Sequence, residues 1–229
     1  TLAYALAAYL PAHMSPARTY DMIELATELI TLATDLGEPE RAVEGYLCRA
    51  CPFLELGEIE RARDDAMEMT RLAEELRQPA QRLYAANLRA HLALLAGEFE
   101  EAGQLVEEGL DFGDRAQRWN AQITYRLQLY MLRKAQGRLE EVVGLYEAQP
   151  SAVEFRTYRI FDCVLARIYD EMGRRDEARA KFEELAENDF ADVPLDEEWL
   201  ASVCLLAETA ASLGDLRRGR VLIGANEAA

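Results

Sequence analysis

Cys48 and Cys51, which are separated by Arg49 and Ala50, are the only closely spaced cysteines in the sequence. This spacing occurs in redox pairs and zinc sites, but those roles need a helix N-terminus or two further ligands nearby. The pair lies instead within a predicted helix, and no Cys or His follows it at a zinc-finger spacing. We therefore predict that both thiols pack within the fold and that no metal is bound.

The other residue types that could carry out chemistry lack the neighbours they would need. His13 and His91 are the two histidines, and neither has an identifiable partner for nucleophilic or acid–base catalysis. The triplet Asp-Phe-Gly occurs at 111–113 without any other kinase element. No phosphate-binding glycine loop, serine-nucleophile elbow or helical metal motif is present in the sequence. We predict no catalytic, cofactor-binding or metal-binding residue, and expect both histidines to pack in the fold or line a binding groove.

Composition and charge restrict the class of partner. The formal net charge is −17, whereas nucleic acids and anionic membranes attract basic surfaces, so we expect contact with neither. No apolar run in the sequence approaches the ~18–20 residues of a membrane span. The apolar stretch 1–10 lacks the basic leader and cleavage site of a signal peptide, so we expect a helix there. Four scattered cysteines suit a reducing cytoplasm, and the absence of an initial methionine favours a fragment of a longer protein.

One short phrase recurs along the chain, each time around a glycine. It reads LELGEIERA at 54–62, LLAGEFEEA at 94–102, KAQGRLEEV at 134–142, YDEMGRRDEA at 169–178 and ASLGDLRRG at 211–219. The aligned glycines are spaced by 40, 40, 36 and 41 residues; they are Gly57, Gly97, Gly137, Gly173 and Gly214. Self-similarity at such a period is typical of a solenoid built from repeats.

Each repeat predicts two helices in an antiparallel hairpin. An apolar-periodic helix ends at the glycine, which can adopt the left-handed conformation that closes helices. A second helix then starts with a small residue five positions after the glycine, which lets the two helices approach closely. These residues are Ala62, Ala102 and Ala178, with Val142 and Gly219 as departures. Between the pairs lie proline segments at 38–40, 77–80, 149–154 and 192–198, and Ser151 with Glu154 fits a capping box.

This pattern resembles the tetratricopeptide repeat. The residues that match it best are Tyr46, Ala50, Phe53, Gly57 and Ala62. The usual period is about 34 residues, so units near 40 residues imply longer helices. Elongated units of this kind are similar to the C-terminal arrays of LuxR-type and MalT-like transcriptional activators and of ATPase-linked class III nucleotide cyclases. The likeness covers residues 2–216 and is greatest at 72–102, 127–141 and 196–215, whereas the tail at 217–229 departs from it.

The resemblance implies an all-α, right-handed superhelical solenoid of helix hairpins that spans 1–229 as a single domain. We expect eleven or twelve helices in five complete pairs or slightly more. The implied function is that of a regulatory sensor module in a cytoplasmic bacterial signalling protein with an ATPase domain, and not that of an enzyme. Two alternatives remain open, namely a free-standing adaptor that bridges two proteins and a structural spacer that sets oligomer geometry.

In such arrays the first helix of each pair lines an inner groove. Counting back from the glycines by the helical period gives ten candidate groove residues, and we expect six of them, Tyr84, Asn87, His91, Met131, Lys134 and Arg167, to form the central ligand contact. The other four are Leu47, Cys51, Leu127 and Glu208. This mixed surface suits an extended or helical peptide, or a flanking domain of the parent chain. The alternative is that half of these residues pack between neighbouring pairs. The anchor that we expect is an apolar side chain near Tyr84 and Met131, with a carboxylate toward Lys134 and Arg167.

Charge and hydropathy also vary along the chain. Residues 119–175 carry 7 acids and 9 bases, between the acidic segments 35–114, with 19 acids and 8 bases, and 176–215, with 12 acids and 2 bases. The middle segment could attract an acidic ligand through its cations, although a solvated face of alternating sign explains the contrast too. Those cations include Arg126, Arg133, Lys134, Arg159 and Arg167. Both ends are apolar and lack a polar capping unit, so we expect apolar surface there, covered by flanking domains or by self-association.

Overall fold

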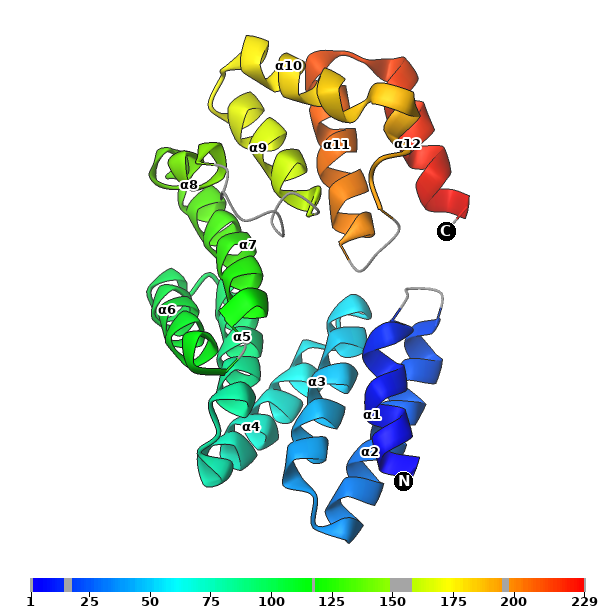
Figure 1. Ribbon diagram of the computed structural model, residues 1–229, viewed down its shortest axis with the longest axis vertical. Helices are drawn as coiled ribbons and strands as arrows, with labels where there is room; N and C mark the ends of the chain where they lie inside the picture. The colour runs from blue at the N-terminus through cyan, green and yellow to red at the C-terminus, as the bar shows by residue number, and fades with distance from the viewer. Residues whose placement is uncertain (1, 15–17, 117, 149–157, 195–197, 229) are drawn as a thin grey trace. The chain divides into compact units, whose positions relative to one another are not determined.

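The computed structural model describes residues 2–14, 18–116, 118–148, 158–194 and 198–228. These residues form twelve α-helices and two 3-10 helices, with no strand among them (Figure 1). Consecutive helices pack as pairs, which confirms the predicted α-solenoid and the expected number of helices. None of the helices in these ranges combines the length and the apolar character that a membrane crossing requires.

The chain divides into two compact units, residues 1–132 and 133–229, and each is described by itself. Unit 1 contains α1 (Leu2–Ala12), α2 (Thr19–Leu36), α3 (Pro39–Glu55), α4 (Ile59–Leu76), α5 (Pro79–Ala96), α6 (Phe99–Ala116) and most of α7 (Arg118–Gln136). Unit 2 contains the end of α7, η2 (Leu139–Glu141), α8 (Val143–Glu147), α9 (Ile160–Glu171), α10 (Arg175–Leu185), η4 (Glu187–Phe190), α11 (Trp199–Leu213) and α12 (Leu216–Ala228). The first helices of the predicted pairs are α3, α5, α7, α9 and α11.

The recurring glycines end the first helices, as the sequence predicts. All five have left-handed backbones, with φ between 67° and 79°. At Gly97 the amides of Gly97 and Glu98 donate to the carbonyl oxygens of Leu94 and Ala93, at 3.1 and 2.9 Å, and so satisfy carbonyls that the helix end leaves open. Gly37 ends α2 in the same conformation, with φ of 66°.

The second helices begin earlier than predicted. They start two residues after the glycine, for example at Ile59 and Phe99, so the prediction of a start five residues after it was wrong. The reason is that Glu58 already serves as the N-cap residue, and its carbonyl oxygen accepts hydrogen bonds from the amides of Arg61 and Ala62 at 3.1 and 3.2 Å. The small residue therefore lies within the first turns of the helix. Ala62, Ala102 and Ala178 are at most 1% exposed there, which agrees with the predicted close approach.

The proline segments have different outcomes. Pro39 and Pro79 occupy the first turns of α3 and α5, as predicted. The capping box predicted from Ser151 and Glu154 lies outside the described residues. The two confirmed prolines show that the sequence marks the starts of these first helices.

The second half of the pair that begins with α7 departs from the pattern. After Gly137 the chain forms the 3-10 helix η2 and then the five-residue helix α8, where a full second helix was expected. Val142 and Val143 are β-branched and Gly144 follows them, so this segment has low helix propensity. The C-terminal tail, by contrast, does form a full helix. It continues as α12 and buries Leu222, although its sequence departs from the family pattern.

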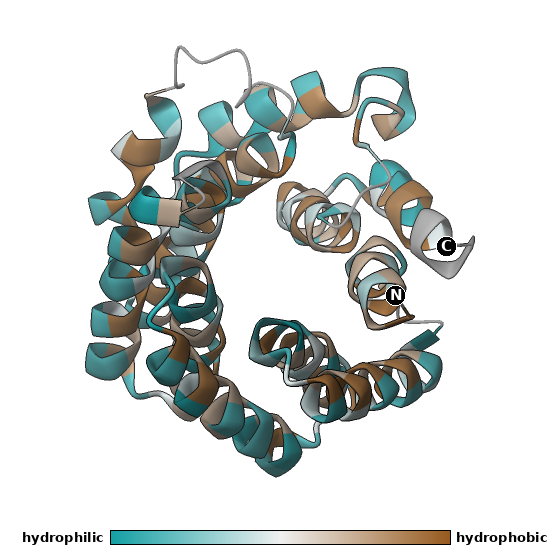
Figure 2. Cartoon of the chain, turned by 60° about the horizontal axis from the view of Figure 1, so that its bottom comes forward, coloured by the Kyte–Doolittle hydropathy of each residue, from teal (hydrophilic) through white to brown (hydrophobic). Residues whose placement is uncertain are grey.

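Each unit has its own apolar core. In unit 2, Phe182, Leu206 and Ala210 belong to one cluster contributed by α9 to α12. In unit 1, small side chains of α5 such as Ala90 and Ala93 pack with Ala102 of α6. Figure 2 shows apolar residues alternating with hydrophilic ones around the helices, as one-sided burial requires.

The small positions provide a test of this packing. We expect Ala102→Leu to lower the free energy of unfolding by roughly 1–3 kcal/mol, because added methylenes overpack a close helix crossing. Ala96→Leu places the same change on an exposed residue of the preceding helix and serves as the control. Chemical denaturation followed by circular dichroism measures both variants. Equal unfolding midpoints for the two variants would contradict the predicted crossing.

The predicted apolar surface is present toward both ends of the helical array. Leu2 and Tyr4 of α1 are 53% and 66% exposed, and Leu216 and Ile223 of α12 are 69% and 56% exposed. Leu6, Leu10 and Leu222 are buried against the rest of the fold. Each of the two helices therefore exposes apolar side chains on one side only. What covers these surfaces stays a prediction.

Candidate binding surfaces

The structure places all six predicted contact residues on first helices. Tyr84, Asn87 and His91 lie in α5, Met131 and Lys134 in α7, and Arg167 in α9. The first four belong to unit 1, and Lys134 and Arg167 belong to unit 2. In unit 1, His91 contacts Gln128 of α7, which lies three residues before Met131. In unit 2, Lys134 and Arg167 both pair with Glu171.

His91 contacts the neighbouring first helix. Its Nδ1 lies 3.2 Å from Nε2 of Gln128 in α7 and 3.3 Å from the carbonyl oxygen of Asn87. The Gln128 amide also donates to that carbonyl oxygen at 3.0 Å, and Gln128 is only 5% exposed. A neutral imidazole with its proton on Nε2 can accept from Gln128 at Nδ1. In this tautomer the Nε2–H of His91 has no hydrogen-bond partner over the described residues and can donate to a ligand.

The protonation of His91 follows from the same surroundings. Its side chain reaches solvent, but crowding by protein desolvates the ring and lowers its pKa, an effect that the Asn87 carbonyl opposes. His91 is therefore neutral at neutral pH. Because the unfolded chain binds the proton more tightly, this group contributes stability above about pH 6.5 that is lost as the pH falls through the lowered pKa.

We expect His91 to titrate below about pH 6.5, the value of an unperturbed histidine. NMR of the imidazole C–H signals across this range measures the midpoint. The His91 signal is assigned by its absence from the His91→Asn variant. A midpoint at or above the unperturbed value would show that crowding does not desolvate the ring.

Tyr84 and Asn87 take part in packing as well as in the surface. Tyr84 is half-buried against the core cluster that α3, α4 and α5 share. The side-chain oxygen of Asn87 points at Gly109 of α6, where a Cβ atom would lie only 2.8 Å from it. A side chain at position 109 would therefore collide with Asn87. Tyr84 and Asn87 therefore both lie between helices, with part of each side chain in solvent.

Met131 is the most exposed of the predicted apolar contacts, at 48%. It follows Gln128 by about one helical turn, on the α7 face that meets His91. Leu95 follows His91 by one turn on α5 and is 63% exposed. We call His91, Leu95 and Met131 the first-helix surface. Leu95 was missed in the sequence, although its spacing of four residues from His91 places both on one face.

The cations predicted to hold a ligand carboxylate are already paired within unit 2. Nζ of Lys134 lies 3.0 Å from Glu171 and 3.7 Å from Glu208. The Arg167 guanidinium lies 2.5 Å from Asp170, 2.9 Å from Glu171 and 3.0 Å from Glu208. We call these five residues, from α7, α9 and α11, the Arg167 cluster.

The charge of the Arg167 cluster does not favour an acidic ligand. It contains two bases and three acids, and Asp170 also accepts a hydrogen bond from Ser212 Oγ at 2.6 Å. Arg133 and Arg159 of the same middle segment pair with Glu141 at 3.0 Å and Asp162 at 3.3 Å. The predicted attraction of an acidic segment is therefore weakened, because such a ligand must displace internal carboxylates. Asp170 and Glu171 follow Arg167 by three and four residues on α9, a spacing that the sequence analysis did not use, whereas the pairing of Lys134 with Glu171 and of both cations with Glu208 depends on how the helices pack.

The two cysteines of the close pair pack as predicted. Cys48 is 6% exposed, in a cluster with Met22 and Ala26. Burial raises the pKa of Cys48 to about 12 and that of Cys51 to about 11, so both thiols are protonated at neutral pH. Among the described residues, no group of three or more His, Cys, Asp or Glu side chains is arranged to hold a metal ion. His13 lies on the surface, where its ring stacks on Tyr9 with centroids 3.9 Å apart.

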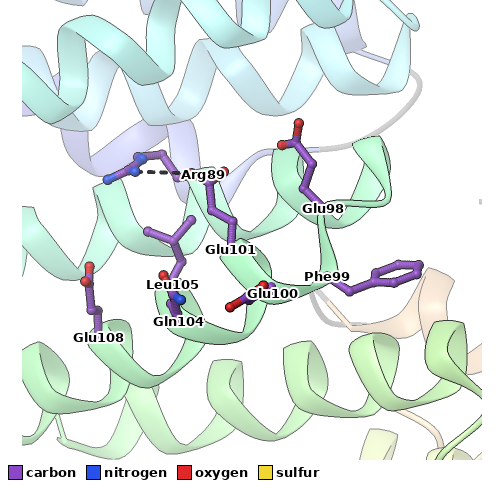
Figure 3. Close-up of a pocket in the computed structure, with 8 residues that line it drawn as sticks. All are labelled: Arg89, Glu98, Phe99, Glu100, Glu101, Gln104, Leu105 and Glu108. Carbon is purple, nitrogen blue, oxygen red and sulfur yellow. Dashed lines mark hydrogen bonds and ion pairs between the residues drawn. The ribbon is translucent and has the colours of Figure 1, made fainter.

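Two open hollows lie on the second-helix side of unit 1. One, of about 580 Å³, lies among α4, α5 and α6, and we call it the α4–α6 hollow. The other, of about 600 Å³, adjoins it and shares the lining residues Arg89, Glu98 and Glu101 (Figure 3). Figure 3 shows the Arg89–Glu101 contact, which measures 3.5 Å, and Phe99 pointing away from Arg89. The sequence did not predict this region, because a hollow between helices depends on how they pack.

Comparison with known proteins supports the fold. No protein-family profile matches the chain, and no curated protein sequence matches it. Among solved structures, the chain is similar to the crystal structure of BtubC (BKLC) from P. vanneervenii, with a TM-score of 0.58 and 18% identity. The match covers 91% of this chain and 89% of that chain. At this identity the likeness shows a shared helical fold alone.

Proposed function

We propose that the chain is a non-catalytic protein-binding repeat module, the regulatory segment of a cytoplasmic bacterial signalling protein that carries an ATPase domain. Its paired-helix solenoid is an architecture that presents extended binding surfaces. The resemblance of its repeats to the arrays of LuxR-type and MalT-like regulators and of ATPase-linked cyclases supports the regulatory role. The ligand in this proposal is a protein segment or a flanking domain of the parent chain.

The first-helix surface carries this proposal. Leu95 and Met131 expose 63% and 48% of their surface on neighbouring first helices. The imidazole of His91, four residues before Leu95 on α5, lies against Gln128, three residues before Met131 on α7. An apolar ligand side chain would cover Leu95 and Met131, and methionine adapts readily to different apolar shapes. A ligand carbonyl oxygen would accept from the neutral His91 at Nε2. Apolar anchors with a neighbouring donor suit an extended or helical segment.

The Arg167 cluster has a different role in this proposal. Its carboxylates satisfy Lys134 and Arg167, so it joins three first helices within unit 2. We therefore place the main ligand contact at the apolar side chains of unit 1, in place of the predicted carboxylate contact with Lys134 and Arg167.

Replacing Met131 by Ser should weaken binding to the remaining domains of the parent protein about tenfold, equivalent to about 1.4 kcal/mol. Leu95→Ser should act in the same direction, because both side chains belong to the same contact. Met14→Ser removes a methionine of similar exposure, 40%, outside the first-helix surface and is the matched control. Calorimetric titration with those domains, supplied as a separate chain, gives the three affinities. Equal affinities for all three variants would exclude the first-helix surface as the site.

A structural spacer is the second candidate, and the exposed apolar residues of α1 and α12 favour it. In that role the module would self-associate through Leu2 and Tyr4 or through Leu216 and Ile223. Sedimentation analysis of a variant with Ser at Tyr4 and Leu216 distinguishes the two functions. Self-association that these changes abolish, together with no binding to the parent's other domains, would favour the spacer.

A further inference from the structure

The α4–α6 hollow has an apolar floor that is open to solvent. Met67 lies on α4 with 63% of its surface exposed, while Ala66 and Leu92, which line the same hollow, are buried. Such a flexible thioether at the edge of a hollow of about 580 Å³ can pack around a bulky apolar side chain. The floor alone would accept many partners, so the charges around it decide which kind fits.

Most carboxylates that line the two hollows have no ion-pair partner among the described residues, whereas the arginines that line them are paired. Over the described part of the chain, Glu74 and Glu98 at the hollow have no ion-pair partner, and neither do Glu100 and Glu108 at the adjoining one. A cation from a partner could therefore approach each of these carboxylates without displacing a partner.

The arginines of the hollow are engaged by glutamates of unit 1. Arg63 pairs with Glu60 at 3.2 Å, and Arg71 pairs with Glu68 at 3.0 Å and Glu75 at 2.8 Å. Arg89 is held by Glu101 at 3.5 Å. The segment 35–114 that builds this region carries 19 acids and 8 bases, so its field attracts cations and repels phosphate-bearing ligands.

We propose that the α4–α6 hollow is a second docking site, which binds a basic amphipathic segment of a partner protein. The segment places one bulky apolar side chain against Met67 and Leu92, and its Lys or Arg residues reach Glu74 and Glu98. This site is formed mainly by second helices and does not depend on the first-helix surface. The module can then hold two different partners at once, one on each surface.

The probe for this site is a synthetic amphipathic helix of about 18 residues, with Leu on one face and Lys on the other. Two control peptides carry Glu in place of Lys, or Ser in place of Leu. The protein is labelled with ¹³C at its six methionine methyl groups. Met67 reports the hollow, Met131 reports the first-helix surface, and buried Met69 reports any general change of fold.

The Leu/Lys peptide should shift the Met67 methyl signal in a saturable manner and leave Met69 unmoved. Its affinity, measured by fluorescence anisotropy, should fall tenfold or more in a Met67→Ser, Glu98→Lys double variant. A Leu36→Ser, Glu24→Lys double variant makes equivalent exposed changes on α2 and should bind as the unaltered protein does. Both control peptides should bind at least tenfold more weakly, and added salt should weaken the Leu/Lys peptide because it screens the rim carboxylates.

An unmoved Met67 signal, or equal affinity in the two double variants, would overturn the proposal. So would self-association that Met67→Ser abolishes while the peptide leaves the Met67 signal unmoved, because a second copy of the chain would then be the occupant. None of these outcomes bears on the first-helix surface, which Met131 reports separately.

Discussion

Replacing Arg49 by Met should lower the free energy of unfolding of unit 1 by about 2–4 kcal/mol, near the cost of breaking a buried ion pair. Asp65 of α4 is 3% exposed and is held by Arg49 of α3 through two hydrogen bonds, at 2.9 and 2.6 Å. The hydrogen bond to Asp65 is the main reason that the pKa of Arg49 is raised. The variant leaves the Asp65 carboxylate inside the fold without its cation.

The matched control for Arg49 is Arg63→Met. Arg63 lies on α4, and its pair with Glu60 at 3.2 Å is exposed, so its loss should change stability by less than about 1 kcal/mol. Adding Asp65→Leu to Arg49→Met should recover part of the loss, because no buried charge remains. Urea denaturation followed by circular dichroism compares the variants. Equal midpoints for Arg49→Met and Arg63→Met would show that the buried pair contributes nothing.

Reversing the charge of Arg167 should destabilise unit 2 by a similar amount, about 2–4 kcal/mol. The Arg167 side chain is 17% exposed, and that of its partner Asp170 is 4% exposed. Glutamate at this position removes the cation that holds three carboxylates and adds a fourth. Lys134 alone then remains to oppose them.

Arg217→Glu is the control for Arg167. Its side chain is 68% exposed and lies 3.5 Å from Asp189, so little change is expected. Thermal unfolding monitored by calorimetry measures both variants. If Arg167→Glu unfolds as the unaltered protein does, the Arg167 cluster is not structural, and its cations become available to a ligand again. The expected result also means that weaker ligand binding by Arg167→Glu would not by itself locate a binding site.

Local patterns in the sequence were sufficient for the repeat architecture. The glycine register predicted the helix ends, because a left-handed residue in that position is a local requirement. The small residues Ala62, Ala102 and Ala178 likewise predicted the crossings, since each lies at a fixed distance from its glycine. The start of the second helix was placed too late, because the apolar pattern does not show that Glu58 already caps the helix.

Features that depend on distant contacts could not be predicted. Lys134 meets Glu171 and Arg49 meets Asp65 only after the helices have packed. The sequence does not predict the exposure of Met67 either, because the burial of a helix face depends on the helices that pack against it. The candidate contacts His91 and Met131 were found from periodicity alone, but the partners of Lys134 and Arg167 were not.

The central claim of the proposed function is that a protein ligand binds the first-helix surface. The most direct test follows the ¹³C-methyl signal of Met131 while the remaining domains of the parent protein are added. We expect Met131 to shift until the surface is saturated, and we expect Met69 to stay in place because it is buried. Leu95→Ser should reduce the affinity about tenfold without changing the spectrum of the free protein elsewhere. Binding of those domains that leaves the Met131 signal unmoved would contradict the claim.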